Sequence, residues 1–523
     1  MRGTSSSHSA AALRIGKIAR SLLAQDINEV HIAFDCSGSL PSTHTTQGSD
    51  MGLAGGILGF EVDDERLPFY ENELKKQGIS IHYQTDDFGD PHPNTYRITL
   101  KNQNESHSMI ALSTGGGMIE VIDIDGARVS IGGDIFITLV YYHGHVASIL
   151  QDLEPRFSDL SMKTGTRQSF IEIRTHAVLP EKRIAAISAM PGVQYIRCLP
   201  PVLPILRPKH LEVPFQTPVE MAAFARDKQL NLDALALQYE SQRGGITEEA
   251  VLQHMTAIVG VLRSSIETGL KGTDFKDRIL GRQSGTYLLN SKSGNLMDTG
   301  MLNLVIPYVT SLMEVKSALG VIVAAPTAGS CGCLPGAVLG AVDFMQRSEE
   351  EAARALLAAG LIGIFIAGIS TFAAEVGGCQ VECGAGSAMA AAGLTTLMGG
   401  TADAALAAAS MALQNSLGMI CDPVAGRVEV PCLGKNTMAA ANAVTCANMA
   451  LSGFDPVIPL GEVIETMDRV GRSLPRELRC TALGGLSITP TAKAIERDLN
   501  HIGQNHRTPE VGTTEDGGQG QTE

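Results

Sequence analysis

The chain has 523 residues, which at roughly 100–200 residues per domain predicts about three domains. It contains 56 glycines, no tryptophan and only 4% aromatic residues, so small aliphatic side chains must fill most of the core. The formal net charge of −15 argues against a nucleic-acid binder, because neutralising phosphates requires an excess of Lys and Arg.

The first 125 residues mix helix and strand and predict an α/β substrate domain. A helical apolar stripe runs over 13–23, and short strands are expected at 30–34 and 96–100. Residues 126–200 form a second module, because strands and helices alternate in the order β-α-β…α-β, which is typical of a ferredoxin-like regulatory module. Its expected elements are strands at 134–141, 169–175 and 193–199 and helices at 146–153 and 181–189.

A stretch rich in proline then separates this module from the rest of the chain. Proline fixes φ and removes a donor, so residues 201–218 predict a stiff, extended linker. The prolines are Pro200, Pro201, Pro204, Pro208, Pro214 and Pro218. Residues 219–498 read as an all-α domain with Ala-rich periodic runs, and the polar, Gly-rich stretch 499–523 predicts a disordered tail. The overall fold class expected is α+β.

One run in the helical region, residues 355–374, has no charge and is long enough to span a bilayer. It is rich in Ala, Gly, Ser and Thr, and it lacks Trp or Tyr belts and flanking Lys or Arg. These features favour a buried helix in a soluble bundle over a membrane span.

Ten cysteines are too few for a disulfide scaffold, and no secretion signal opens the chain, so a cytoplasmic protein with reduced thiols is expected. No C-x₂-C pair occurs, which excludes zinc-ribbon spacing. Iron–sulfur clusters accept dispersed thiolates, and Cys379, Cys421 and Cys432 lie in Gly- or Pro-containing, loop-like contexts. Spacing alone leaves both a metal site and unligated thiols open, whereas Cys446 lies inside a helical run and indicates packing.

Two further polar motifs stand out before the linker. The run from Ser5 to Ser9 precedes a helix and fits either a helix cap or an anion site suited to a carboxylate. The segment His92-Pro93-Asn94-Thr95 predicts a turn with a polar cluster. The Gly-rich segments at 52–59 and 115–117 match neither a dinucleotide fingerprint nor a P-loop, so nucleotide binding is not supported.

Taken together, these motifs resemble those of the iron–sulfur-dependent L-serine dehydratases, also called L-serine ammonia-lyases. The resemblance covers about residues 4–495 and rests on motifs that occur in the family's order. They are Ser5-Ser6-Ser7-His8-Ser9, Gly38-Ser39, Gly48-Ser49-Asp50, His92-Pro93-Asn94-Thr95, Ser113–Gly117, Ala325-Pro326-Thr327-Ala328-Gly329-Ser330, Gly377-Gly378-Cys379-Gln380, Cys421-Asp422-Pro423-Val424, Val430-Pro431-Cys432, Pro475-Arg476-Glu477-Leu478 and Gly484-Gly485-Leu486. In this reading the small and large subunits are fused in that order, and residues 126–200 lie where the small subunit carries an ACT-type regulatory module.

The resemblance implies a 4Fe–4S cofactor held by the metal ligands Cys379, Cys421 and Cys432. An iron without a cysteine is a Lewis acid for the serine hydroxyl, and a base removes the Cα proton. The aminoacrylate formed then gives pyruvate and ammonium. The implied substrate-binding residues are Ser5, Ser6, Ser7, Ser39, His92, Asn94, Thr95, Thr327 and Ser330, and the candidates for proton transfer are His8 and His44.

The chain departs from the family pattern at several points. The expected histidine of the G-H-G-T-D segment is Gln47, which cannot titrate, and Ser9 replaces a threonine. The family usually has a longer lead-in before the serine run, so an N-terminal strand or helix is expected to be missing. No cysteine follows Cys480, so a C-terminal cysteine that occupies the fourth iron is not available. The usual D-x-P-G turn of the regulatory module is replaced by Tyr142-His143-Gly144-His145.

The prediction is therefore a lyase that acts on a small amino acid, without nucleic-acid or membrane partners, and that forms a homodimer. Three rivals remain open. They are a related elimination on cysteine or threonine, a catalytically weak amino-acid-binding regulator suggested by Gln47, and a small membrane transporter suggested only by the uncharged helical runs.

Overall fold

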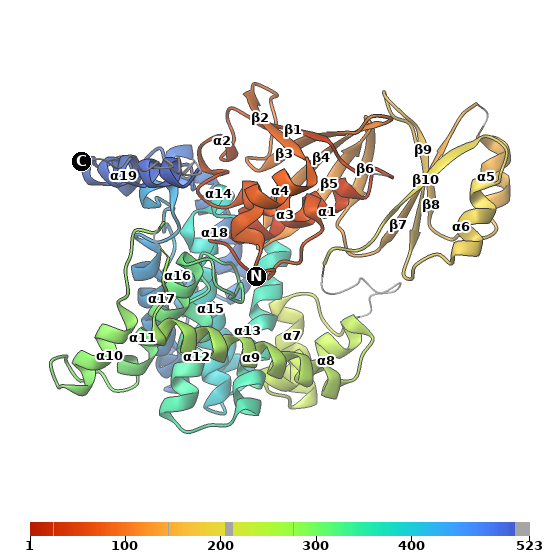
Figure 1. Ribbon diagram of the computed structural model, residues 1–523. Helices are drawn as coiled ribbons and strands as arrows, with labels where there is room; N and C mark the ends of the chain where they lie inside the picture. The colour runs from red at the N-terminus through yellow and green to blue at the C-terminus, as the bar shows by residue number, and fades with distance from the viewer. Residues whose placement is uncertain (25, 145, 204–212, 276, 508–523) are drawn as a thin grey trace, which may run out of the picture.

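The computed structural model describes residues 1–24, 26–144, 146–203, 213–275 and 277–507, except for the side chains of 500–507. It has a mixed α and β architecture with an N-terminal sheet domain and a C-terminal helical domain. Figure 1 shows the sheet domain (red to orange) lying on the helical domain (green to blue), and a smaller module (yellow) that extends away to one side.

The N-terminal domain is built on a six-stranded sheet in the order β2-β1-β3-β4-β5-β6. Only β1 and β2 are parallel; the other neighbouring pairs are antiparallel. The strands are β1 (Glu29–Asp35), β2 (Ser80–Asp86), β3 (Thr95–Lys101), β4 (Ser106–Gly115), β5 (Met118–Ile124) and β6 (Ala127–Ile131). The helical segments are η1 (Ser6–Ala10), α1 (Ala11–Arg20), α2 (Leu40–Thr43), α3 (Ser49–Leu58), η2 (Leu67–Phe69) and α4 (Tyr70–Gln77). The strands predicted at 30–34 and 96–100 are confirmed as the centres of β1 and β3.

Helices α1 and α3 pack closely because glycines face each other across their contact. A Cβ added at Gly56 would lie 2.1 Å from the carbonyl oxygen of Leu13, and one at Gly16 would lie 2.6 Å from that of Leu53. The Gly-rich segment at 52–59 therefore serves helix packing, in agreement with the absence of a nucleotide motif.

The yellow module follows a β-α-β-β-α-β order, and its four-stranded sheet has the order β10-β7-β9-β8. This element order is that of the ferredoxin-like βαββαβ motif. Its elements are β7 (Phe136–Tyr142), α5 (Ala147–Leu153), β8 (Leu160–Lys163), β9 (Phe170–Thr175), α6 (Glu181–Ser188) and β10 (Val193–Leu199). The short edge strand β8 was not predicted, because its alternation of apolar and polar side chains spans only four residues and none of them is buried.

The second half of the chain is helical, and among the described residues its only β pairing is an isolated bridge between Cys421 and Arg479. The α-helices are α7 (Pro218–Lys228), α8 (Leu232–Gly244), α9 (Glu248–Lys271), α10 (Ser284–Lys292), α11 (Leu302–Ser317), α12 (Cys333–Phe344), α13 (Glu349–Ile369), α14 (Ala374–Gly377), α15 (Cys383–Leu397), α16 (Ala402–Gln414), α17 (Cys432–Leu451), α18 (Leu460–Ser473) and α19 (Pro490–Arg507). Short 3₁₀ turns are η3 (Cys379–Val381), η4 (Val424–Gly426), η5 (Arg476–Leu478) and η6 (Gly485–Ile488). Alanines dominate its buried core, so the helices can approach closely.

Helix α13 is the one described helix that is long and apolar enough to cross a membrane by length and composition. Of its most apolar window, 67% is buried inside the molecule. A core helix passes the same test, so this helix gives little support to a membrane span.

The boundaries of the helical domain differ slightly from those predicted. Helix α7 already begins at Pro218, inside the predicted linker, and Thr217 forms a capping box with Glu220. Helix α19 continues to Arg507, so the predicted tail begins as helix. The linker prolines Pro204 and Pro208 and the tail residues 508–523 lie outside the described residues.

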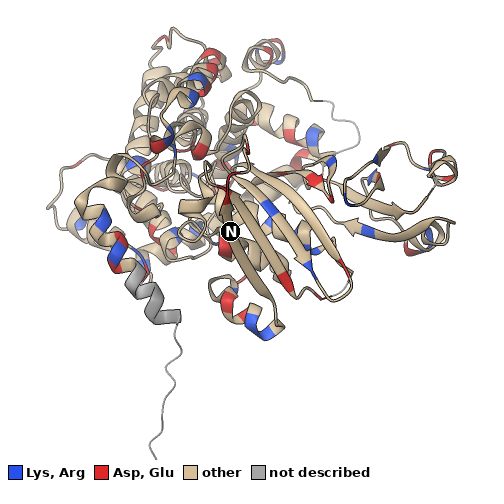
Figure 2. Cartoon of the chain, turned by 90° about the horizontal axis from the view of Figure 1, so that it is seen from above, with Lys and Arg blue, Asp and Glu red and all other residues tan. Residues whose placement is uncertain are grey.

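Loops of the sheet domain dock directly on the helical domain. The backbone N–H of Ala328 donates to Ser6 Oγ at 3.3 Å, and Thr371 Oγ1 donates to the carbonyl of Thr114 at 3.1 Å. A Cβ at Gly115, whose φ is +107°, would lie 2.5 Å from the nitrogen of Ala373, so this turn needs glycine to approach. In the view of Figure 2, basic and acidic residues are interspersed along the ribbon, and no broad basic stripe crosses it.

Candidate active site between the two domains

The serine run lies buried at the domain junction, where the chain enters α1. Residues Ser6–Ala10 form a π-helical turn, a rare geometry that is frequent at functional sites. Ser9 fixes this turn, because its hydroxyl donates to the carbonyl of Gln47 at 3.1 Å. Ser5, Ser6, Ser7 and His8 are all buried, so their polar groups face protein and not bulk water.

His8 is held by contacts on both ring nitrogens. Its Nε2 lies 2.9 Å from Thr43 Oγ1, and its Nδ1 lies 3.1 Å from Ser5 Oγ. Burial lowers the pKa of His8 to about 3, with a smaller contribution from His44. A neutral imidazole is therefore expected at physiological pH.

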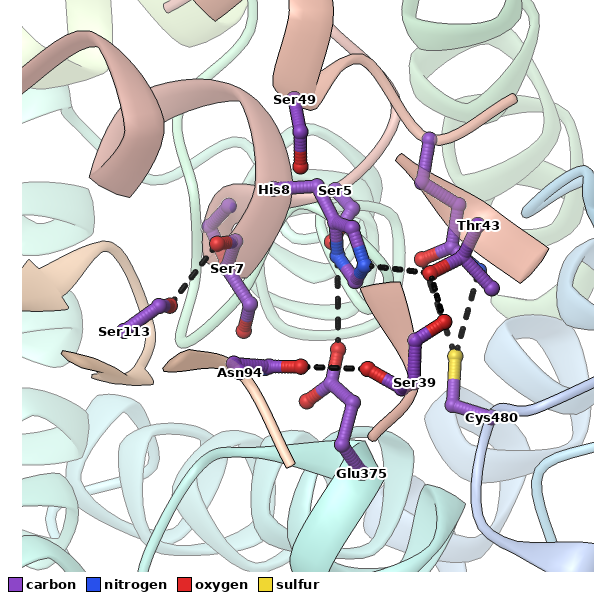
Figure 3. Close-up of polar contacts among 12 residues, drawn as sticks. Ser5, Ser7, His8, Ser39, Thr43, Ser49, Asn94, Ser113, Glu375 and Cys480 are labelled. Carbon is purple, nitrogen blue, oxygen red and sulfur yellow. Dashed lines mark hydrogen bonds and ion pairs between the residues drawn. The ribbon is translucent and has the colours of Figure 1, made fainter. Parts of the chain in front are cut away.

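Glu375, on the short helix α14 of the other domain, meets His8 across the junction. Its Oε1 lies 3.4 Å from His8 Nδ1 (Figure 3). The side chain is almost fully buried, and burial raises the pKa of Glu375 to about 7. Glu375 was not predicted as a site residue, because nothing in its local sequence indicates a contact with a residue near the other end of the chain.

Asn94 comes to the same place from the predicted turn. Ser39 Oγ donates to Asn94 Oδ1, while Asn94 Nδ2 is buried without a hydrogen-bond partner among the described residues (Figure 3). The turn is fixed from within, because the Asn94 N–H donates to His92 Nδ1 at 3.2 Å and Thr95 Oγ1 donates to the His92 carbonyl at 2.8 Å. His92 and Thr95 thus shape the turn that presents Asn94.

A cleft of about 400 Å³ opens beside this cluster, between the two domains. Ser39, His92 and Glu375 line it together with three arginines, Arg472, Arg476 and Arg479. Arg476 also holds the domains together, since its Nη2 donates to the carbonyls of Cys36 and Gly38, each at 3.2 Å. The positive side chains on the wall favour an anionic ligand such as an amino-acid carboxylate.

The cysteines lie beneath this polar cluster on the helical side. The side chains of Cys379, Glu382 and Cys421 bring their ligand atoms within 4.8 Å of one another, and both cysteines are buried. Cys432, the first residue of α17, lies outside this group but interacts electrostatically with Cys379.

Cys480 is a fourth thiol at the same place. It packs against Cys379 and Cys421, and its backbone N–H donates to the Cys421 carbonyl at 3.0 Å. Gln47, which replaces the family histidine, donates from Nε2 to Cys480 Sγ at 3.3 Å. Cys480 is not among the ligands that the family resemblance implies, because a lone cysteine before Thr481 carries no spacing signal.

The donor set suits a thiolate-bound metal cluster. Buried thiols resist ionisation: burial raises the pKa of Cys432 and Cys383, and hydrogen bonding to Cys379 and Cys480 raises the pKa of Cys421. A bound cation reverses this preference. Lys435 supplies a positive charge beside these thiols. Its Nζ lies 3.9 Å from Cys379 Sγ and 2.8 Å from Asp422 Oδ1.

The remaining predicted residues lie at different distances from the cysteines and the polar cluster. Thr327 lies next to the cysteines, since its Oγ1 donates to Glu382 Oε1 at 2.7 Å and lies 3.1 Å from Ser330 Oγ. His44 lies apart: its Nδ1 is 2.6 Å from Asp50 Oδ1, and its ring stacks on Tyr83. Among the described residues it makes no hydrogen bond to His8 or Glu375. Ser7 contributes its backbone carbonyl, which accepts from Ser113 Oγ at 2.8 Å.

Comparison with known proteins identifies the family to which the helical domain is similar. Residues 227–487 match the family model for the serine dehydratase alpha chain. The L-serine dehydratase alpha chain of Peptoniphilus asaccharolyticus is 36% identical over 282 residues, which are 54% of this chain and 96% of that protein. The probable L-serine dehydratase alpha chain of Bacillus subtilis (strain 168) is 33% identical over 285 residues, or 95% of that protein. L-serine dehydratase TdcG of Escherichia coli (strain K12) is 43% identical over 185 residues, 35% of this chain and 40% of that protein.

Proposed function

Because the chain belongs to the serine dehydratase alpha-chain family, whose members named above are lyases, we propose that it converts L-serine to pyruvate and ammonium. The observation that supports this most is that a cysteine site and a polar cluster lie together at the junction between the two domains. A buried cysteine site lies under a polar cluster that carries an unpartnered donor, Asn94 Nδ2, and an unpartnered acceptor, Glu375 Oε2. An amino-acid carboxylate can accept from Asn94 Nδ2, and the free Glu375 oxygen can accept a hydrogen of the same ligand.

The proposed ligands of a 4Fe–4S cluster are Cys379, Cys421 and Cys432. When bound, such a cluster with one iron free of cysteine supplies a Lewis acid for the departing hydroxyl. Lys435 offsets the negative charge of the thiolates at Cys379, and Thr327 orients the Glu382 carboxylate beside them. Ten free cysteines fit a reducing compartment, which supports the proposed cytoplasmic location.

Substrate binding is assigned to the N-terminal side of the junction. Asn94 Nδ2 donates to the serine carboxylate, and the hydroxyls of the serine run and of Ser39 line the same buried space. The arginines on the cleft wall draw the anionic group inward. Burial of the site excludes bulk water, so each of these hydrogen bonds is stronger than it would be in solution.

A regulatory role is proposed for residues 126–200, in line with the ACT-type module that the family resemblance implies. Its support is the βαββαβ order and its position away from the helical domain (Figure 1). Serine added at millimolar concentration should change the hydrogen exchange of this module. If the enzyme is active but the hydrogen exchange of this module does not change, the module has a structural role only.

The substrate is tested by product analysis of the anaerobically reconstituted protein. L-Serine should give pyruvate at the highest kcat/KM, with threonine giving less 2-oxobutyrate and cysteine less sulfide. A higher kcat/KM for threonine or cysteine would move the proposal to a related elimination. Serine binding in calorimetry without any turnover by the loaded protein would instead indicate an amino-acid-binding regulator.

A further inference from the structure

The hydrogen bonds around His8 determine which ring nitrogen carries the proton. Thr43 Oγ1 donates its only hydrogen to the Ser39 carbonyl at 2.7 Å, so it must accept from His8 Nε2. In a neutral imidazole, Nδ1 is then an acceptor, and it faces Ser5 Oγ and Glu375 Oε1 (Figure 3). The hydrogen-bond network thus makes His8 a poor base and places its lone pair against Glu375.

Glu375 Oε1 lies 3.4 Å from the His8 Nδ1 lone pair, so a carboxylic acid can direct its proton toward that nitrogen. A carboxylate at this position instead faces a lone pair and low-dielectric surroundings. Both effects favour the protonated form, in agreement with the raised pKa that burial causes. His8 and Glu375 therefore reverse the usual order of proton affinity of an imidazole and a carboxylate.

The second carboxylate oxygen, Glu375 Oε2, is buried without a partner among the described residues. Glu375 lines the cleft between the domains, so a ligand there can reach it. Asn94 Nδ2 is likewise unpartnered, as is Arg479 Nε on the cleft wall. Asn94 stands beside Glu375 in Figure 3, and its side chain partly offsets the rise that burial causes in the pKa of Glu375. A substrate held through its carboxylate at Asn94 brings its Cα, one bond away, toward this oxygen.

Other charged groups surround Glu375 from each neighbouring element. Glu382, after η3, opposes its ionisation, and Cys480 lies within electrostatic range. Burial raises the pKa of Tyr96 of β3, and the charge of Glu375 adds a smaller rise. Arg472 of α18 and the loop residues Arg476 and Arg479 share the cleft wall, together with Asp90 and His92 of the sheet domain.

We propose that Glu375 is the catalytic base that removes the Cα proton of the substrate, with His8 as its positioning residue. This rests on the proposed function. The Cα–H bond breaks as an O–H bond forms on Glu375, and the electron pair forms the Cα=Cβ double bond. The Cβ–O bond breaks with its pair on hydroxide, which takes up a proton to give water. The 2-aminoacrylate tautomerises to the imine, which water hydrolyses to pyruvate and ammonium, and Glu375 loses the proton it gained.

The test is Glu375→Gln in the full-length reconstituted enzyme, with Glu462→Gln as the matched control because Glu462 is exposed on α18. We expect kcat to fall by about 10²–10⁴-fold, the range for a lost general base, with KM within about threefold. In the wild type kcat/KM, which reports the ionisation of groups in the free enzyme, should rise with pH through about 7, where the carboxyl ionises, and then level off. Glu375→Asp should keep this rise with a partly restored kcat, and Glu462→Gln should match the wild type.

Iron content and visible absorption of Glu375→Gln are measured beside its activity. They should equal those of the wild type, which separates a lost base from a lost cluster. A variant that keeps wild-type kcat and the rise near pH 7 would overturn the assignment. So would a variant whose KM rises strongly while the pH profile persists, because Glu375 would then bind the substrate ammonium. An inactive wild type with a full cluster would contradict the proposed function instead.

Discussion

At the scale of single residues, the site consists of buried polar atoms whose partners are missing or come from the opposite domain. Asn94 and Glu375 each keep one atom unpartnered, while Ser39, Thr43 and Ser5 satisfy the atoms around them. A buried polar atom left without a partner costs about 1–3 kcal/mol, which a bound ligand can recover. This pattern identifies where the substrate is expected to bind.

Asn94 tests the substrate-binding part of this arrangement. Asn94→Ser removes the donor proposed for the serine carboxylate, and we expect kcat/KM to fall about 10- to 100-fold, since a hydrogen bond to a charged group contributes about 1.5–3 kcal/mol. Asn448→Ser, on the exposed face of α17, is the matched control and should leave kcat/KM unchanged. Equal kinetics for both variants would place the carboxylate elsewhere.

The cysteines are tested by a matched pair of substitutions. Cys421→Ala should lose both the cluster absorption and the activity, because Cys421 lies with Cys379 at the proposed cluster site. Cys446→Ala should keep both, because Cys446 lies within α17 and contacts Asn415 and Asn442. Loss of the cluster in Cys446→Ala to the same extent would show that the ligand assignment is wrong.

Part of the site was predictable from local sequence and part was not. The turn around Asn94 and the serine run before α1 were predicted because Pro, Asn and Ser carry local backbone preferences. Glu375, Glu382 and Cys480 were missed because each acts through a contact with a distant segment. Gln47 stands where the family has a titratable histidine. Only the structure shows its partner, because its side-chain amide donates to the distant Cys480 Sγ.

At the scale of elements, close backbone packing positions the serine run. The contact between α1 and α3 depends on glycines, and α1 follows directly after the π-helical turn that holds His8. The regular strands β1 and β3 were predicted because apolar and polar residues alternate in them. Strands β2, β4, β5, β6 and β8 were not predicted. The edge strands β2 and β8 bury no side chain fully, and in β4 the buried positions include His107, Ser113 and Gly115, which hide the apolar pattern.

The helix contact makes a stability prediction. Gly56→Ala places a Cβ 2.1 Å from the Leu13 carbonyl, and backbone must move to relieve the clash. We expect the free energy of unfolding of the N-terminal domain to fall by about 1–3 kcal/mol in urea denaturation. Gly260→Ala in α9 meets nothing within 4 Å and should leave stability unchanged or raise it by about 0.5–1 kcal/mol. Equal stability of the two variants would show that α1 and α3 are not held by this contact.

At the scale of the whole molecule, the proposed active site lies where the two domains meet. The sheet domain supplies His8, Ser39 and Asn94, and the helical domain supplies Glu375 and the cysteines. A single chain that contains both parts keeps them at high effective concentration. The order of the domains was predictable from the motifs, whereas the docking contacts between them were not, because they join backbone atoms far apart in the sequence.

The central claim is that this junction is an iron–sulfur serine dehydratase site. The most direct measurement is the rate of pyruvate formation from L-serine against bound iron, in one protein preparation reconstituted anaerobically to graded extents. The rate should rise in proportion to the 4Fe–4S content up to about four irons per chain, and the iron-free protein should be inactive. Pyruvate formation by the iron-free protein, or none by the fully loaded protein, would contradict the account.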